Sequence, residues 1–220
     1  MAVTLDELVV ADVADAWRAC GFAVDGDVCL VGEVRIRFAP QEGRRGLSAW
    51  SLRGVESTAL DGLPTTVSES DRTQLSPHTG DNCAQTPQEH PNGVIALDHV
   101  VAISSDLDRT VAALEAAGLD LRRIREEPTP AGAPRQAFFR LGQAILEVVQ
   151  EPAEATERAG GDRPAFFWGL AFVTPDLDTT VAFFGDRASE PRDAVQAGRR
   201  IATLRRSAGL GLPVALMTPP

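Results

Sequence analysis

The sequence has no lysine, and its 21 basic residues, all of them arginine, are outnumbered by 31 acidic residues. The formal net charge is therefore −10. A nucleic-acid-binding protein needs a basic surface that releases counterions from phosphates, so this balance argues against that class. Most of the clustered arginines are expected to be solvated or to lie at helix ends. They are Arg122, Arg123, Arg125, Arg199, Arg200, Arg205 and Arg206.

Cysteines and long apolar runs are scarce as well. Cys20, Cys29 and Cys83 have no CxxC or cysteine–histidine spacing, so we expect neither a zinc site nor a disulfide framework. The longest apolar runs, such as 166–173, are far shorter than the roughly 20 residues that cross a bilayer. The first residues are acidic, unlike a secretory signal. We therefore expect a cytoplasmic protein without a membrane or nucleic-acid partner.

The sequence does contain an internal repeat. Residues 97–112, LDHVVAISSDLDRTVA, align without a gap with residues 167–182, FWGLAFVTPDLDTTVA. Each copy is an apolar strand followed by a short oxygen-bearing side chain, which is typical of a helix N-cap. Apolar positions spaced by three and four then predict a helix over 107–119. Strands are expected next over 121–125, 135–141 and 144–149 in the first copy, and over 196–205 and 214–217 in the second. The repeating unit is thus βαβββ.

A shorter third copy is expected at the N-terminus, with Leu5–Val10 as its first strand and Leu47 to Leu52 as its fourth. From Val55 to Gly93 the composition shifts to Ser, Thr, Pro, Gln and Asn, which is typical of a linker or long loop. We expect the two histidines there, His78 and His90, to be solvated. The predicted organisation has a degenerate module in 1–60, a linker in 61–93, and a domain of two paired modules in 94–220 (94–152 and 165–220).

These features resemble the vicinal oxygen chelate superfamily, which includes glyoxalases, bleomycin-resistance proteins and extradiol dioxygenases. The resemblance rests on the repeated unit, on Leu-Asp-His-Val-Val at 97–101 and on Ile-Leu-Glu-Val-Val at 145–149. It implies an α+β fold in which βαβββ modules pair into a cupped, barrel-like mixed sheet with helices outside. It also implies a small-molecule ligand and, where a metal is present, protein ligands from the first and last strands of a module.

On this chain the resemblance places His99 and Glu147 at those positions, as catalytic residues and as metal ligands. Imidazole and carboxylate suit Zn, Ni, Fe or Mn. The second repeat departs from the pattern, because Gly169 replaces the histidine and Ala215 or Leu216 replaces the acid. Catalytic metal sites usually have three protein ligands, and the repeat suggests only Glu7 as a third. A metal-free pair, in which the carboxylate is hydrogen-bonded to the imidazole, is an equally valid interpretation.

Arg140 and Phe138 are the candidate substrate-binding residues, Arg140 for an anionic group. Trp168 and Phe138 could stack on a planar ligand, although core packing is the more common role for such residues. Three functions stay open, so whether the protein is an enzyme is undecided. It could be a metal-dependent lyase, isomerase or dioxygenase acting on a vicinal-oxygen compound, a metal-free binding or sequestering protein, or a scaffold. A homodimer is also expected if the N-terminal copy pairs with its twin.

Overall fold

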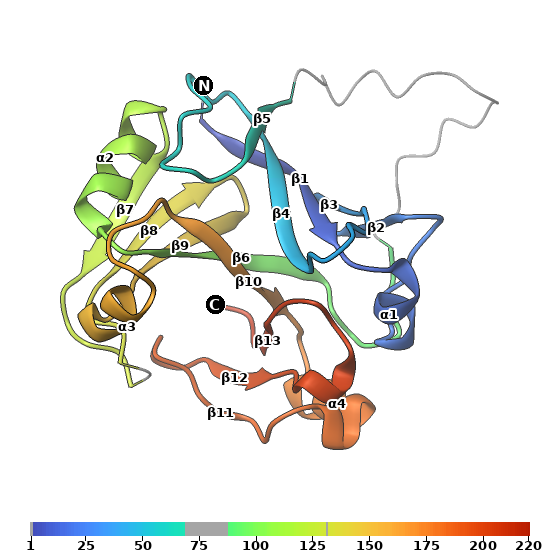
Figure 1. Cartoon of the computed structure of the whole chain (residues 1–220). Coiled ribbons are helices and arrows are strands. Elements are labelled where there is room, and N and C mark those ends of the chain that lie inside the picture. Colours follow the sequence, from blue (N-terminus) through green and yellow to red (C-terminus); the bar gives the residue numbers. More distant parts are fainter. Residues whose placement is uncertain (1, 69–87, 131) are drawn as a thin grey trace.

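The computed structural model describes residues 2–68, 88–130 and 132–220, and its larger sheet contains two joined βαβββ modules (Figure 1). The first module consists of β6 (Ala96–Ser104), α2 (Leu107–Ala116), β7 (Asp120–Arg125), β8 (Gln136–Leu141) and β9 (Ala144–Gln150). The second consists of β10 (Phe166–Val173), α4 (Leu177–Phe184), β11 (Arg192–Asp193), β12 (Arg200–Thr203) and β13 (Val214–Met217). Three short helical segments lie between or within them: α3 (Ala153–Arg158), η1 (Gly185–Arg187) and η2 (Arg206–Ala208).

The eight strands follow the order β11-β12-β13-β10-β6-β9-β8-β7. In each module the first strand runs parallel to the last, and β6 and β10 pair antiparallel at the centre. The predicted α+β fold of paired modules in a cupped mixed sheet is confirmed. The sheet does not close into a barrel, since β7 and β11 are at its two ends.

The local signals of the repeat determine how each module turns from strand to helix. Asp106 and Asp176 accept hydrogen bonds from backbone N–H groups three residues ahead, each at 3.0 Å, as N-cap residues do. A hydroxyl pair also repeats: Ser104 to Thr110 and Thr174 to Thr180, both at 2.6 Å. The two modules therefore share their turn chemistry as well as their order of elements.

The N-terminal sheet differs from the expected single module. It consists of β1 (Thr4–Ala11), β2 (Val28–Val31), β3 (Val34–Phe38), β4 (Gly46–Arg53) and β5 (Thr65–Val67), with α1 (Ala14–Ala19) after β1, and its order is β2-β3-β1-β4-β5. β1 pairs parallel with β3 and antiparallel with β4, as β6 does with β9 and β10. The assignment of 47–52 to the last strand of the first module is therefore wrong, because β4 corresponds to β10, the start of another module.

The N-terminal part of the chain thus contains parts of two modules, and β5 lies inside the segment expected to be a linker. The division of the chain at residues 60 and 93 stays a prediction. His78 and Cys83 lie outside the described residues. Among the residues that the structure places, no helix combines the length and apolar character needed to cross a membrane.

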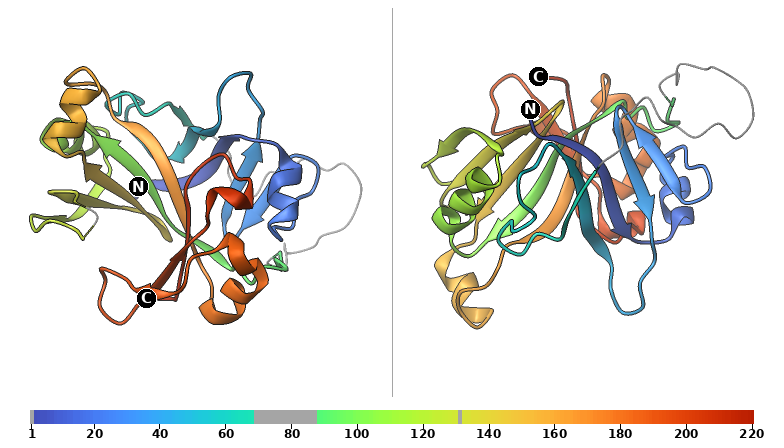
Figure 2. Two further views of the ribbon diagram at one scale, coloured as in Figure 1. Left: turned by 60° about the horizontal axis from the view of Figure 1, so that its bottom comes forward. Right: turned by 90° about the horizontal axis from the view of Figure 1, so that it is seen from above.

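The N-terminal sheet packs against the outer, convex face of the larger sheet (Figure 2). The indole of Trp17 lies 6.3 Å from the ring of Phe172, and Trp50 lies 4.9 Å from Phe167, in both cases between ring centroids. α2 covers the same outer face over β7, β8 and β9. The opposite, concave face carries His99 and has no such cover among the described elements.

The expectation of a solvated His90 is wrong, because its side chain is buried, with 7% of it exposed. Its Nδ1 accepts a hydrogen bond from the backbone N–H of Ala23 at 3.1 Å, and its ring lies 5.7 Å from Phe22. Burial lowers the pKa of His90 below its ordinary value of 6.5, against an opposing hydrogen bond to the backbone of Leu30. The folded protein therefore favours the neutral imidazole.

This burial predicts a loss of stability in mild acid. Above about pH 6.5 the imidazole is neutral in both the folded and the unfolded chain, but below it the unfolded chain binds the proton more readily. The free energy of unfolding should therefore fall as the pH drops from about 7.5 to about 5.5. His90→Gln, whose amide oxygen can still accept the Ala23 N–H, should flatten this dependence in urea unfolding curves. Identical slopes for the two proteins would contradict the prediction.

Candidate functional site

His99 and Glu147 lie side by side on the concave face of the larger sheet. His99 is on β6 and Glu147 is on the parallel neighbour β9, where its register partner is Val101. The imidazole Nε2 is 3.3 Å from Glu147 Oε2, and the two side chains are only 17% and 15% exposed. The structure therefore brings together the two residues that the sequence analysis selected. Their catalytic role stays a prediction.

A β-bulge adds a third group to this pair. His99 opposes Ala171 and Leu97 opposes Phe172, so Asp98 is left without a partner in the ladder. A bulge re-aims the side chain of the extra residue, which frees it from strict alternation. As a result, Asp98 Oδ2 reaches Nδ1 of its own neighbour His99 at 2.7 Å.

Arg199 from the second module holds Asp98 in place. Its Nη2 donates to Asp98 Oδ1 at 2.5 Å, and it also donates to the carbonyl of Thr218 at 2.6 Å. Burial alone would raise the pKa of Asp98, but hydrogen bonds from His99 and Arg199, together with their positive charge, lower it below its ordinary value. Asp98 is therefore an ionised carboxylate, which can only accept hydrogen bonds.

The state of the imidazole follows from these partners. Because Asp98 can only accept, Nδ1 of His99 must carry a proton and donate it. In a neutral ring Nε2 would then be a lone pair facing a carboxylate oxygen at 3.3 Å, which is repulsive. A cation between the two atoms removes this repulsion. A proton is such a cation, whether it is bonded to Nε2 of His99 or to the carboxylate of Glu147. The geometry is thus that of a pair sharing one transferable proton.

Three further side chains on β8 line the same face. Gln136, Phe138 and Arg140 alternate with the buried Ala137, Phe139 and Leu141 of the outer face. The Nε2 of Gln136 donates to Glu147 Oε1, and Phe138 is the register partner of Glu147. Exposure rises along the strand from the buried Gln136 to the exposed Arg140. The predicted substrate-binding residues, Phe138 and Arg140, therefore share the face of the pair, at its open end.

The second module has no second polar pair at the corresponding positions, and Trp168 is the extra residue of a β-bulge between Phe167 and Gly169, so alternation does not assign its side chain to either face. Trp168 and Phe166 on β10 are 49% and 38% exposed, so the expectation of core packing for Trp168 is wrong. At Gly169, the equivalent of His99, an added Cβ would lie 2.7 Å from the carbonyl oxygen of Pro213. No side chain fits there without a shift of the backbone.

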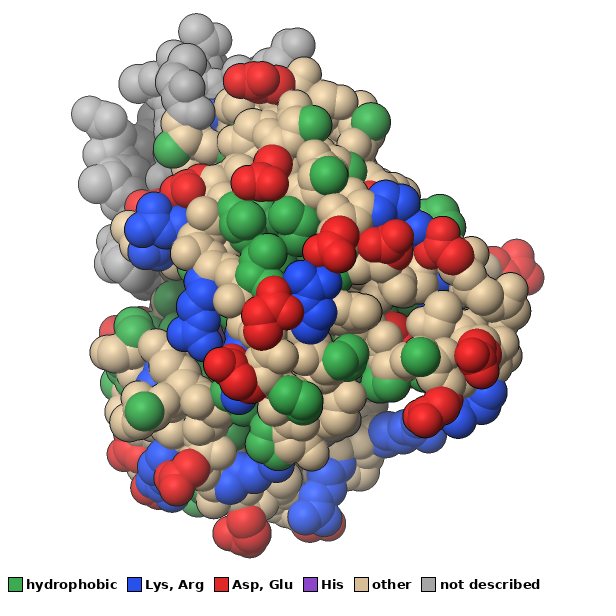
Figure 3. Space-filling view, turned by 90° about the vertical axis from the view of Figure 1, so that its left-hand side faces the viewer, with side chains coloured by type: hydrophobic (Ala, Val, Ile, Leu, Met, Phe, Trp, Pro, Cys, Tyr) green, Lys and Arg blue, Asp and Glu red, His purple; other side chains and the backbone are tan. Residues whose placement is uncertain are grey.

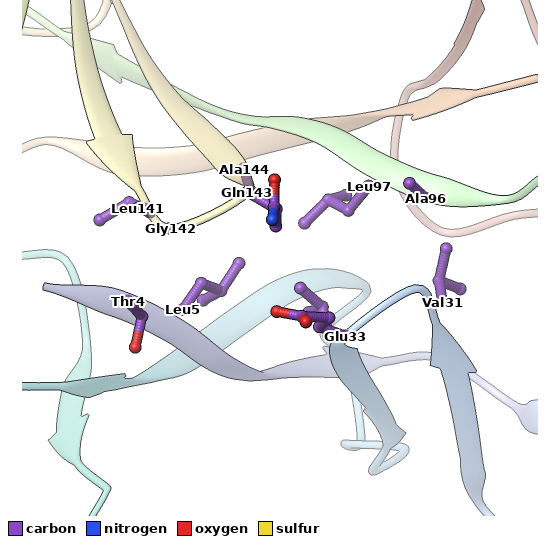
Figure 4. Close-up of a pocket in the computed structure, with 11 residues that line it drawn as sticks. Thr4, Leu5, Val31, Glu33, Ala96, Leu97, Leu141, Gly142, Gln143 and Ala144 are labelled. Atoms are coloured by element: carbon purple, nitrogen blue, oxygen red, sulfur yellow. The ribbon is translucent and has the colours of Figure 1, made fainter. Parts of the chain in front are cut away.

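Two hollows on the described part of the chain lie away from this face. One, of about 50 Å³, lies between Leu5 of the N-terminal sheet and Leu97 and Leu141 of the larger one (Figure 4), and it is too small for a substrate. The other is an open depression beside α3, lined by Glu151 and Glu154. On one side of the molecule acidic, basic and apolar side chains are interspersed (Figure 3). The side chains of His99 and Glu147 are only 17% and 15% exposed, so the pair itself is largely shielded from solvent.

The donor set does not fit a catalytic divalent metal ion. His99 Nε2 and Glu147 supply two ligands, whereas catalytic sites usually supply three. Gly169 and Ala215 have no donor, and no group of three or more His, Cys, Asp or Glu side chains among residues 2–68, 88–130 and 132–220 could hold an ion. Glu7, the suggested third ligand, lies on the N-terminal sheet and pairs with Arg37 at 3.0 Å.

The N-terminal sheet has a different pair of side chains at the positions equivalent to His99 and Glu147. Glu7 and Arg37 occupy the strand positions of His99 and Glu147, since β1 and β3 have the register of β6 and β9. The N-terminal pair is a carboxylate with a permanently charged guanidinium, which has no proton to exchange near neutral pH. Only one of the two copies therefore keeps a pair able to transfer a proton.

Sequence reasoning missed Asp98 as a member of the site, and it left Gln136 and Arg199 unassigned, because a register error of one residue reverses which side chains face inward. Asp98 directly precedes His99, so strict alternation would place it on the other face. Arg199 was expected to be solvated with the other arginines, but only 6% of it is exposed. No sequence signal marks the bulge that brings Asp98 into the site.

Comparisons with known proteins give structural neighbours only. No protein-family model matches the chain, and no curated protein does. The chain is similar to methylmalonyl-CoA epimerase from Mycobacterium tuberculosis (21% identity, TM-score 0.48, covering 58% of this chain and 90% of that one). It is also similar to a Streptomyces coelicolor methylmalonyl-CoA epimerase variant in complex with 2-nitronate-propionyl-CoA (23%, 0.46, 57% and 94%) and to a hypothetical protein from Bacillus halodurans (16%, 0.45, 56% and 94%).

Similarity at this level of identity and TM-score decides no activity for this chain. The functional argument therefore rests on the side chains of the concave face.

Proposed function

We propose that this protein is a glyoxalase-like enzyme of the isomerase or lyase type that moves a proton on a small vicinal-oxygen compound without a metal. The observation that carries the proposal is the pair of atoms, His99 Nε2 and Glu147 Oε2, that face each other at 3.3 Å while Asp98 fixes the proton on Nδ1. Proton transfer by a positioned imidazole or carboxylate is the common form of general acid–base catalysis.

The chemistry follows from the charged state of the pair. With His99 as imidazolium and Glu147 as carboxylate, Glu147 removes a proton from a carbon next to a carbonyl group. The electrons of the broken C–H bond move into the carbonyl, and His99 donates its Nε2 proton to the carbonyl oxygen. The result is an enol, a neutral imidazole and a protonated Glu147. The enol O–H then returns its proton to Nε2 of His99 as Glu147 gives its proton back to carbon. Protonation of the opposite face, or of the neighbouring carbon that carries the second oxygen, gives an isomer and restores both side chains to their starting charge.

One observation favours a second function, metal-free binding or sequestering. Gly169 and Ala215 leave the second module without a histidine or an acid at the positions that correspond to His99 and Glu147. In that case His99 and Glu147 would bind a hydroxyl or amine of a ligand. The two functions differ in whether a C–H bond is broken.

Solvent deuterium exchange separates them. The protein, dialysed against EDTA, is incubated in D₂O with pyruvate, dihydroxyacetone or phenylpyruvate, and loss of the C–H signal is followed by proton NMR. We expect exchange above the buffer rate with at least one compound, unchanged by EDTA. Ligand binding without any exchange would support sequestering. A stoichiometric first-row metal in protein purified without chelators, with exchange lost in EDTA, would support the metal-dependent function.

Asp98→Asn tests the role of the bulge residue. An asparagine amide can donate to Nδ1, which would leave the imidazole protonated on Nε2 alone and remove the carboxylate that stabilises the imidazolium. We expect the exchange rate to fall by about 10- to 100-fold while the fold is kept. Nitrogen-15 NMR of the imidazole should show both nitrogens protonated in the parent protein and only Nε2 protonated in the variant. Both nitrogens protonated in the two proteins alike would contradict this role for Asp98.

A further inference from the structure

The amide group of Gln136 lies against the carboxylate of Glu147 and is buried, with only 7% of the residue exposed. Its Nε2 donates to Glu147 Oε1, and the reversed amide would bring two acceptor oxygens together, which fixes this orientation. The amide oxygen Oε1 then has no hydrogen-bond partner among the residues that the structure describes. A buried acceptor without a partner is unfavourable and uncommon in folded proteins. The site therefore contains an unused acceptor beside its carboxylate.

A buried donor without a partner lies on the next strand. Arg125 on β7 is the register partner of Gln136, and cross-strand partners project from the same face of a sheet. Only 17% of the Arg125 side chain is exposed, and its Nη1 has no hydrogen bond with any described residue. Its Nε is 3.6 Å from Glu127 Oε2, which is too long for a hydrogen bond. Neighbouring residues thus present one donor and one acceptor, both buried and both unpaired.

The other side chains around the amide cannot pair these two atoms. Val149 on β9 is the register partner of Gln136, and Ile103 on β6 is that of Val149. Phe138 lies two residues along β8, on the same face as Gln136. None of the three has a polar side-chain atom, and all three are only half-buried, so a small ligand has only partly exposed side chains to displace. The donor and the acceptor are therefore available to a ligand.

The kind of ligand group follows from this pairing. A hydroxyl accepts a hydrogen bond from Arg125 and donates one to Gln136 at the same time. A second carbonyl or an ether oxygen only accepts, and an ammonium group only donates and has the same charge as the arginine. A carboxylate also only accepts, and it would lie beside the like charge of Glu147. A neutral hydroxyl is the smallest group that satisfies both atoms.

We propose that Gln136 Oε1 and Arg125 Nη1 bind a hydroxyl group on the carbon next to the carbonyl group of the substrate. The inference rests on the proposed function and makes its substrates α-hydroxy ketones and α-hydroxy aldehydes. The strands β6, β9, β8 and β7 are consecutive in the sheet, and they carry His99, Glu147, Gln136 and Arg125 in that order. Both His99 and Gln136 contact the one carboxylate. A carbonyl oxygen at His99, a C–H bond at Glu147 and a hydroxyl at Gln136 follow one another as they do in such a compound.

The carbon that bears the hydroxyl is the one that loses its proton. Glu147 takes this proton, the electrons of the C–H bond form a carbon–carbon double bond, and the carbonyl oxygen takes the Nε2 proton of His99. The product is a neutral enediol, and its hydroxyl keeps its contacts with Gln136 and Arg125. These contacts thus direct the C–H bond of the same carbon toward Glu147.

The test measures binding of 3-hydroxy-3-methylbutan-2-one, with 3,3-dimethylbutan-2-one as its match. The match has a methyl group in place of the hydroxyl and almost the same shape. The hydroxyl-bearing carbon of the first ketone has no hydrogen, so its binding can hold or fail independently of proton transfer. Nitrogen-15 NMR titration of the protein gives both affinities. We expect the hydroxy ketone to bind at least about fivefold more tightly, since it pairs two buried polar atoms that a methyl group leaves unpaired.

Two variants locate the hydroxyl. Gln136→Met removes the acceptor and Arg125→Met removes the donor, and each should lower the preference for the hydroxy ketone by about threefold or more. The matched controls are Gln143→Met, at an exposed position in the turn after β8, and Arg122→Met, at a position where 59% of the side chain is exposed. Both controls should leave the preference unchanged. Circular dichroism of the variants separates loss of the site from loss of the fold.

Equal affinity for the two ketones, no binding of either, or an unaltered preference in Gln136→Met or Arg125→Met would each overturn the proposal. A different result would count against the proposed function alone. If the parent protein prefers the hydroxy ketone but exchanges no C–H bond of dihydroxyacetone, the hydroxyl site stands and the proton transfer does not.

Discussion

Glu147→Gln should lower the rate of C–H exchange by about 10²- to 10⁴-fold, the usual contribution of a general base. The amide has the shape of the carboxylate, but it cannot accept a proton from carbon. Its oxygen can still accept the hydrogen bond from Gln136. The measurement is the initial exchange rate in D₂O with the best of the three carbonyl compounds.

Two controls make this result specific. Glu154→Gln removes the same charge from an exposed position in α3 and should leave the exchange rate unchanged. Glu147→Asp keeps the base but withdraws it from the substrate, so it should retain more activity than the amide. If the amide variant exchanges as fast as the parent protein, Glu147 is not the base. Melting temperatures of the three variants equal to that of the parent protein would show that the fold is intact.

The centre of the site could be predicted because its signals are local. The gapless repeat identifies β6 and β10, the N-caps Asp106 and Asp176 identify where each helix begins, and the parallel pairing of first and last strands then brings His99 next to the strand of Glu147. The sequence left open whether His99 and Glu147 bind a metal or act as an acid–base pair, because the same two residues suit both roles. The structure favours the acid–base pair, since the second module lacks the donors that a catalytic metal site would need.

The rest of the site depends on contacts between distant parts of the chain. Arg199 reaches Asp98 across 101 residues, and Asp98 turns toward it only because one residue bulges out of the ladder. A shift of one residue reverses which face a side chain occupies, so alternation alone misplaces Asp98. The sequence also could not predict that β4 pairs with β1 on the side opposite β3, since an apolar strand carries no local signal for which strand it pairs with.

Polar contacts also join the N-terminal sheet to the larger sheet, and Asp12 lies at their centre. Its carboxylate is 3% exposed and accepts hydrogen bonds from the indole N–H of Trp17 at 3.2 Å, from Arg45 at 2.7 Å and from the backbone N–H of Gly211 at 2.7 Å. The residues belong to α1, to the segment before β4 and to the segment before β13. One side chain thus links the N-terminal sheet to the second module.

Asp12→Ala should therefore be among the most destabilising single changes in the protein. It leaves the N–H groups of Trp17 and Gly211 without an acceptor, and each buried donor left unpaired costs about 1–3 kcal/mol. The ion pair with Arg45 adds less, because that arginine is 56% exposed. We expect a loss of about 2–4 kcal/mol in the free energy of unfolding, or roughly 5–15 °C in Tm. Calorimetry and urea unfolding measure both.

Asp15→Ala is the matched control, since Asp15 lies three residues away with a side chain that is 90% exposed and bonds only to Arg18. Its effect should stay within about 0.5 kcal/mol, as for most surface substitutions. Asp12→Asn should fall between the two, because an amide oxygen in the place of Oδ2 can accept from both Trp17 and Gly211, whereas the amide nitrogen in the place of Oδ1 cannot accept from Arg45. If Asp12→Ala and Asp15→Ala melt at the same temperature, the two parts of the chain are held together by their apolar contacts alone, through Trp17 and Phe172.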